Sequence, residues 1–295
     1  MTFKESLKKS DFVITAQVNL AEAPDADALV RQGEILQPAV DAIQVADESS
    51  TRMQMAGLAA AAILMPLGID PVLHMICRDR NRIAMVKDLI GASAIGVSSI
   101  LVKRGKKFDK DNNSGVQNVF DLSAIEFMNY IRSMKESGHY PFAADLLTGA
   151  SAKVFEPAAE WEPKSLLLKC ESGARFIQNS LCFDMAVVRR YMKSVVESKL
   201  THKLNFIMAA SPLPSAKVAH WIRDNVEGAQ IPDAIIERME QASDPESEGV
   251  EICAELIREL ASIPGVSGVN LSTLGRIETI PAAIEASGVR LPRES

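Results

Sequence analysis

Short runs of β-branched and apolar residues alternate with longer stretches of helical periodicity along almost the whole chain. The longer stretches carry apolar residues at the i, i+3, i+4 and i+7 spacing of helices that bury one face. The short runs are apolar on both faces, which is typical of parallel strands that are covered by helices. The predicted strands are Phe12–Leu20, Ala42–Asp47, Pro71–Cys77, Ser99–Lys103, Phe142–Leu147, Arg175–Leu181, Leu204–Ala209 and Val266–Ser272.

Strands that are each followed by a helix predict a (β/α)8 TIM barrel, a fold of about 250 residues. A doubly wound open sheet is the competing architecture, because alternation alone does not distinguish a closed sheet from an open one. Three helical stretches between the last two strands favour a barrel with extra helices in one loop: Ser215–Asn225, Asp233–Gln241 and Gly249–Ser262. No linker rich in Pro, Gly or Ser divides the chain, so we expect one barrel domain over residues 1–295. Residues 1–10 are expected to be a flexible N-terminal extension.

Composition narrows the class of protein. The 32 Lys and Arg against 38 Asp and Glu give a net charge of −6, which disfavours general nucleic-acid binding. No apolar run reaches the ~18–20 residues of a membrane span, and the polar N-terminus is unlike a signal peptide. The four Cys include no C-x-x-C pair, so neither a disulfide framework nor a cysteine zinc site is predicted. We therefore expect a cytoplasmic enzyme or ligand-binding barrel that holds no metal.

The active site of a parallel barrel forms at the carboxyl ends of its strands. This rule selects polar residues at or just after the predicted strands. They are Gln17, Asn19, Gln44, Asp47, Glu48, His74, Cys77, Arg78, Asp79, Lys103, Arg104, Lys106, Lys107, Asp145, Gln178, Asn179, Ser180, Asp184, Ser211, Asn270, Ser272 and Thr273.

Two of these segments could hold an anion. In Lys103–Lys107 (KRGKK), a glycine among four cations could approach a phosphate closely; a solvated basic loop is an equal alternative. The segment Arg78–Arg82 could hold an anion at a helix start, or it could form an internal Arg–Asp network that braces the loop. Neither G-x-G-x-x-G nor a P-loop motif is present.

The remaining candidates have simple structural alternatives. His74 lies inside an apolar run, where a hydrogen-bonded core histidine is commoner than a ligand. Cys77 and Cys182 lie near strand ends without an evident base, and a role as small apolar side chains explains them better than a role as nucleophiles.

Several blocks resemble the methylenetetrahydrofolate reductase family in their order and spacing from about Phe12 to Val289. They are LHMICRDRNR around Cys77, GARFIQNSLCFD around Phe183, and the tail from SPLPSAK to PGVSGVNL. The resemblance implies a flavin-bearing (β/α)8 barrel that reduces 5,10-methylenetetrahydrofolate to 5-methyltetrahydrofolate with NAD(P)H.

The resemblance also implies roles for individual residues. The family's catalytic glutamate falls at Gln17, whose amide cannot deliver a proton, so Asp47 or water would have to supply it. The family's aspartate near the flavin falls at Lys106, and a cation there would raise the potential of the flavin. His74 and Lys169 match positions that contact the cofactor, and Ser180 replaces the glutamine that binds folate. The expected cofactor-binding residues are His74, Cys77, Arg104, Gly105, Lys106 and Lys169, and the expected substrate-binding residues are Gln178, Ser180 and Phe183.

These departures leave more than one function open. The first is a divergent reductase of one-carbon metabolism and methionine biosynthesis that uses FAD, with FMN or no flavin as alternatives. The second is a folate- or flavin-binding paralogue without the standard reductase activity, either an accessory to demethylation or a non-catalytic partner subunit. The expected partner is a folate-type small molecule, without nucleic acid or membrane. We also expect a homo-oligomer, with a heteromeric partner as the alternative.

Overall fold

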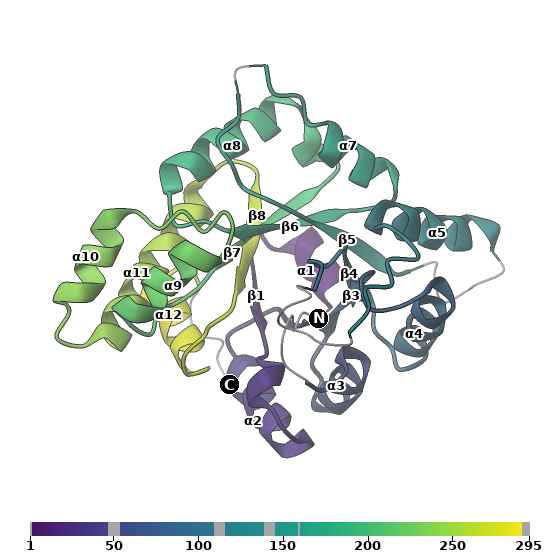
Figure 1. Cartoon of the computed structure of the whole chain (residues 1–295), viewed down its shortest axis with the longest axis horizontal. Helices are drawn as coiled ribbons and strands as arrows, with labels where there is room; N and C mark the ends of the chain where they lie inside the picture. Colours follow the sequence, from purple (N-terminus) through teal and green to yellow (C-terminus); the bar gives the residue numbers. More distant parts are fainter. Residues whose placement is uncertain (1, 47–53, 109–115, 139–144, 159, 291–295) are drawn as a thin grey trace.

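The strands of the chain close into a barrel of parallel strands (Figure 1). The computed structural model describes residues 2–46, 54–108, 116–138, 145–158 and 160–290. Consecutive strands pair in sequence order, and β8 pairs with β1 through the register of Thr15 with Asn270. This closure confirms the (β/α)8 barrel and excludes the open sheet. The strands are β1 (Val13–Gln17), β2 (Ala42–Val45), β3 (Pro71–Ile76), β4 (Ser99–Lys103), β5 (Leu147–Ala152), β6 (Phe176–Leu181), β7 (Asn205–Ala210) and β8 (Val266–Leu271).

The prediction of the fifth strand was wrong. It placed the strand at Phe142–Leu147, whereas β5 is Leu147–Ala152, with the sequence LTGASA. Tertiary packing requires small residues in this strand, because a Cβ at Gly149 would lie 2.2 Å from Cζ of Phe176, whose ring fills that space. Asp145 consequently precedes β5 at the amino-terminal end of the barrel, where it pairs with Lys4 at 3.5 Å. The structure therefore removes Asp145 from the candidate site.

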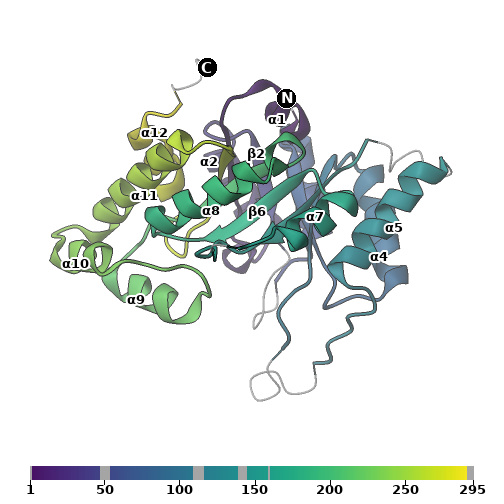
Figure 2. The ribbon, with the colours of Figure 1, turned by 90° about the horizontal axis from the view of Figure 1, so that it is seen from above.

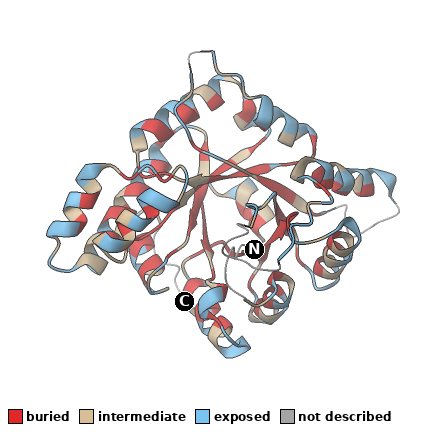
Figure 3. Cartoon of the chain, in the orientation of Figure 1, coloured by how far each residue is buried: buried red, intermediate tan, exposed pale blue. Residues whose placement is uncertain are grey.

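Helices surround the barrel, with buried residues on the sides that face the strands (Figure 3). The extra helices before β8 are confirmed as α9, α10 and α11, and they enclose a small apolar cluster of their own with Phe183 and Leu213. No helix in the described ranges is long and apolar enough to cross a membrane. The α-helices after α1 are α2 (Ala26–Leu36), α3 (Gly57–Leu64), α4 (Arg82–Ala94), α5 (Ala124–Ser137), α7 (Lys164–Glu171), α8 (Met185–Glu197), α9 (Ala216–Asn225), α10 (Asp233–Gln241), α11 (Pro245–Ser262) and α12 (Thr279–Ser287).

The first residues form a helix that packs on the amino-terminal end of the barrel. We expected residues 1–10 to extend flexibly, but Phe3–Lys9 form α1, which begins with a capping box between Thr2 and Glu5. Phe3 is fully buried in the lower barrel interior, and its ring meets that of Phe176 edge to face at 5.2 Å. One apolar side chain therefore holds the segment in place. Figure 2 shows α1 at one end of the barrel and the excursion between β4 and α5 at the other.

Removal of the Phe3 ring tests this packing. We expect Phe3→Ala to lower the free energy of unfolding by about 3 kcal/mol, the usual cost of deleting a buried aromatic ring. Urea unfolding followed by circular dichroism measures the change. Leu274→Ala is the control, because Leu274 is 57% exposed. Equal unfolding midpoints for the two variants would show that α1 does not pack under the barrel.

Candidate functional site

A layer of polar side chains crosses the middle of the barrel interior. Thr15 Oγ1 donates to Asn270 Oδ1 at 2.9 Å, and Gln44 Nε2 donates to Thr15 Oγ1 at 3.1 Å. Gln44 Oε1 lies 2.7 Å from His74 Nε2, so the chain of hydrogen bonds continues from β8 through β1 and β2 to β3. Gln178 of β6 is also buried. We call Thr15, Gln44, His74, Gln178 and Asn270 the polar layer.

The chain of hydrogen bonds fixes the tautomer of His74. Because the Gln44 amide nitrogen donates to Thr15, its oxygen must accept, and His74 Nε2 must carry the proton. His74 Nδ1 is then an acceptor, and it has no hydrogen-bond partner in the described structure. Burial and the nearby charge of Lys103 lower the pKa of His74 well below its usual value. The imidazole is therefore neutral at pH 7.

Gln178 offers a second acceptor. Its Oε1 is buried and has no hydrogen-bond partner among the described residues. Buried acceptors without partners are rare in folded proteins and call for an explanation. A ligand that presents N–H groups would satisfy both His74 Nδ1 and Gln178 Oε1.

A buried arginine braces the basic segment Lys103–Lys107. Arg78 is 2% exposed and binds both carboxylate oxygens of Asp79, at 2.5 and 3.0 Å. Its Nη1 also donates to the Lys106 carbonyl at 3.1 Å, and its guanidinium lies 3.8 Å from the centre of the Phe108 ring. Of the two predictions for Arg78–Arg82, the internal Arg–Asp network is therefore the one observed.

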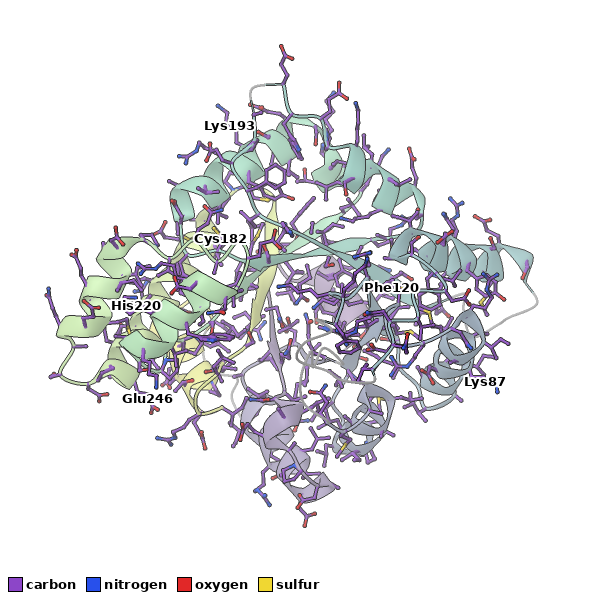
Figure 4. All side chains as sticks on the ribbon, viewed as in Figure 1. Lys87, Phe120, Cys182, Lys193, His220 and Glu246 are labelled. Atoms are coloured by element: carbon purple, nitrogen blue, oxygen red, sulfur yellow. The ribbon has the colours of Figure 1, made fainter. Side chains whose placement is uncertain are left out.

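Gly105 lets the basic segment approach the end of β3. Its φ is +83°, and a Cβ there would lie 2.6 Å from Ile76 Cγ2 and 2.8 Å from Arg78 Cβ. The backbone is fixed while the flanking side chains of Arg104 and Lys106 remain exposed. The Arg104 guanidinium lies 4.7 Å from the ring of Phe120, which Figure 4 labels.

Charged residues of two other loops interact with each other and with the basic segment. Glu227, in the loop after α9, bonds to Lys153 after β5. That hydrogen bond, with the charges of Lys153 and Lys106, lowers the pKa of Glu227. Lys106 therefore lies within electrostatic reach of a carboxylate from the loop after α9.

Some predicted residues do lie at this end of the barrel. Gln17 ends β1 and pairs in register with Gln44, two positions beyond the Thr15 of the polar layer. Ser180 Oγ accepts from the Val154 amide at 3.0 Å and so ties the loop after β5 to β6. Asp47 lies outside the described residues.

The structure does not bring four other candidates to the polar layer. Cys77 packs in the apolar core between sheet and helices, where burial raises the pKa of its thiol to about 12. Phe183 packs in the cluster under α9 and α10. Asp184 caps α8 by accepting from two backbone amides. Lys169 lies in the last turn of α7, which runs back from the mouth, and so it is not part of the polar layer.

Thr15 and Glu227 were not among the predicted residues. Thr15 lies two positions before Gln17 and therefore shares its inward face, which the alternation of side chains along a strand could have indicated. Glu227 had no comparable signal, because its loop approaches Lys153 only through the fold.

The comparison with known families decides the relationship. A sequence model of the methylenetetrahydrofolate reductase family matches residues 27–288. The chain belongs to the methylenetetrahydrofolate reductase family. A Caenorhabditis elegans protein named as a probable methylenetetrahydrofolate reductase (NADPH) is 24% identical over 240 residues. That match covers 78% of this chain but 34% of the relative, so the chain spans about a third of the relative's length.

Two solved structures resemble this member of the family in fold. One is an uncharacterized protein from Clostridium thermocellum that binds two copies of 5-methyl-5,6,7,8-tetrahydrofolic acid. Its TM-score is 0.65 at 12% identity, over 96% of this chain and 97% of that chain. The other is the EDTA monooxygenase EmoA from Chelativorans sp. BNC1, with a TM-score of 0.58 at 8% identity over 94% and 92%. At these identities the likeness concerns the fold alone.

Because His74 is neutral in the folded protein, the free energy of unfolding should depend on pH. In the unfolded chain His74 binds a proton below pH ~6.5, whereas the folded pKa is lower, so the unfolded state holds the extra proton. Stability should therefore fall as pH drops below ~6.5, by at most about 1.4 kcal/mol per pH unit from this group.

Urea unfolding between pH 7 and 5 measures this slope. His74→Gln should reduce it, and His202→Gln, which alters an exposed side chain, should preserve it. An unchanged slope in His74→Gln would mean that His74 is not held neutral.

Proposed function

We propose that this family member binds a flavin and a reduced folate at the carboxyl end of its barrel. There it reduces 5,10-methylenetetrahydrofolate to 5-methyltetrahydrofolate with NAD(P)H. The observation that carries the proposal is the pair of unpartnered buried acceptors, His74 Nδ1 and Gln178 Oε1. Both the uracil edge of a flavin and the pterin of a folate present N–H donors of the kind that these acceptors require.

The residues present fit both groups in charge as well as in hydrogen bonding. Arg104, Lys106 and Lys153 surround the mouth with cations, which suits the phosphates of FAD or the glutamate carboxylates of a folate. Lys169 would contact only the distal part of an extended dinucleotide. A bound flavin would supply two-electron acceptance from NAD(P)H and hydride donation to the methylene carbon.

The protein's own side chains would orient the bound ring and determine where the proton of the reaction comes from. Neutral His74, held by Gln44, accepts an N–H and so orients the ring plane. Gln17 can hydrogen-bond the pterin at the end of β1 but has no proton to give. The reduction consumes one proton for each NAD(P)H, and we assign its delivery to solvent or to Asp47.

The second candidate is a folate-binding paralogue without reductase activity. The amide at Gln17 favours it, because general acids contribute typically 10²–10⁴-fold to rate. The solved neighbour from Clostridium thermocellum, which binds 5-methyl-5,6,7,8-tetrahydrofolic acid, supports a folate ligand in either case.

Restoring a carboxyl at residue 17 separates these candidates. We expect Gln17→Glu to raise NAD(P)H oxidation that depends on methylenetetrahydrofolate by about 100-fold or more, because it supplies a general acid. The assay follows absorbance at 340 nm with purified, flavin-loaded protein. Gln37→Glu adds the same charge at an exposed position and should change nothing.

The remaining outcomes of that assay are also informative. Folate binding with no folate-dependent oxidation in either the native chain or Gln17→Glu would select the binding paralogue. Neither flavin nor folate binding would reject both candidates.

The charge at Lys106 should tune the flavin. We expect Lys106→Asp to lower the two-electron potential of the bound flavin by roughly 30 mV, equivalent to about 1.4 kcal/mol, because it replaces a cation that favours the reduced anion. Exposure of Lys106 keeps the effect well below its Coulombic limit. Spectroelectrochemistry measures the potential, and Lys87→Asp on α4 (labelled in Figure 4) is the matched control. Equal potentials for both variants would place the flavin away from the basic segment.

A further inference from the structure

A cavity lies on the outer side of the sheet, away from the polar layer. Its volume is about 90 Å³, and Thr148 of β5 contributes to its wall. Thr148 alternates with Gly149, whose Cα faces the Phe176 ring in the barrel interior, so the Thr148 side chain faces the helices. The lining residues are Met128, Ile131, Arg132, Lys135, Thr148, Gly173 and Arg175.

Three cationic side chains converge on this cavity. Arg132 and Lys135 come from the last turns of α5, and Arg175 precedes β6. Lys135 is partly buried, and burial together with the charges of Arg175 and Lys4 lowers the pKa of its ammonium group. The charge of Arg175 therefore acts on the Lys135 ammonium group, and the carboxylate of Asp145 acts in the opposite direction.

The hydrogen bonds of these cations in the described structure go mainly to backbone carbonyls. Lys135 donates to the Leu146 carbonyl, Arg132 to that of Glu171, and Arg175 to those of Cys170 and Ala174. A lysine has three N–H donors and an arginine has five, so each retains donors for a further acceptor.

The nearby carboxylates do not neutralise the cavity. Glu136 lies 3.8 Å from Arg132, and its side chain is 69% exposed. Asp145 pairs with Lys4 and is fully exposed. The cations Arg132, Lys135 and Arg175, with Lys4 nearby, outnumber these carboxylates, so a net positive charge remains at the cavity.

Thr148 supplies an independent sign of a missing ligand. The residue is 2% exposed, and its Oγ1 has no hydrogen-bond partner in the described structure. A buried hydroxyl without a partner is costly, and beside three cations the group that would satisfy it is an acceptor.

We propose that this cavity binds a phosphate-sized oxyanion. The ligand would accept hydrogen bonds from the Thr148 hydroxyl and from the N–H groups of Lys135 and Arg175. Its source is either inorganic phosphate or the phosphoryl group of a phosphomonoester. The volume is well below the ~300–1,000 Å³ of pockets that enclose whole drug-sized ligands, so a complete nucleotide is excluded.

Thermal unfolding tests the site directly. Sodium phosphate replaces chloride up to 20 mM at constant ionic strength, and β-glycerophosphate forms a parallel series. We expect phosphate to raise the Tm of the native chain by about 2 °C, since a ligand that binds only the folded state stabilises it. A response to both compounds identifies a phosphoryl site, and a response to phosphate alone identifies a free-ion site.

Variants at the cavity give a signature that a merely structural role would not. Thr148→Val should unfold at or above the native temperature without phosphate, because it removes the unpaired hydroxyl, yet it should lose the phosphate response. Thr148→Ser should keep the response. Arg175→Gln should weaken the apparent Kd about tenfold, the loss of one charge-assisted hydrogen bond. Lys193→Gln, at an exposed position of α8 labelled in Figure 4, is the charge-matched control.

Two results would overturn the proposal. One is a Tm of the native chain that neither phosphate nor β-glycerophosphate changes. The other is a full response in both Thr148→Val and Arg175→Gln, which would place the anion elsewhere, for example at Lys103–Lys107. The first result leaves the proposed folate or flavin site untouched, because that site lies on the inner side of the sheet.

Discussion

The hydrogen bond between Gln44 and His74 organises the interior of this barrel. It begins a chain of hydrogen bonds that runs from His74 through Gln44 and Thr15 to the Asn270 carboxamide oxygen, and it leaves a neutral imidazole with one nitrogen free to accept. Reversal of the Gln44 amide would require the Thr15 hydroxyl to donate to Gln44 instead of to Asn270 Oδ1. The closed barrel makes this hydrogen-bond chain possible, because β8 lies next to β1 only when the sheet closes.

In the basic segment Lys103–Lys107, the backbone is held by buried contacts whereas charged side chains are exposed. Arg78 and Gly105 hold the backbone of the basic segment against β3 through buried contacts, while the side chains of Arg104 and Lys106 face solvent. A buried anchor with exposed charges suits a mouth that accepts an anionic ligand. Membership of the methylenetetrahydrofolate reductase family agrees with such a mouth, and under the proposed function Gln17 is the position at which this chain lacks a proton donor.

The sequence predicted the barrel because each buried strand shows the same apolar pattern, and it failed where tertiary packing sets the residue type. The strand LTGASA lacks β-branched runs since Gly149 makes room for Phe176. In the site, the strand-end rule identified Gln44, His74 and Asn270 but not Thr15. It also included Cys77, because proximity to a strand end does not reveal which face a side chain occupies.

The protonation state of His74 is the most direct test of this account. NMR of the chain with ¹⁵N-labelled histidine at pH 7 distinguishes the two nitrogens of the imidazole and reports a ligand at either one. The account predicts a proton on Nε2, a bare Nδ1, and a change in the Nδ1 resonance when 5-methyltetrahydrofolate or flavin is added. A doubly protonated ring, or a Nδ1 signal that saturating folate and flavin leave unmoved, would contradict it.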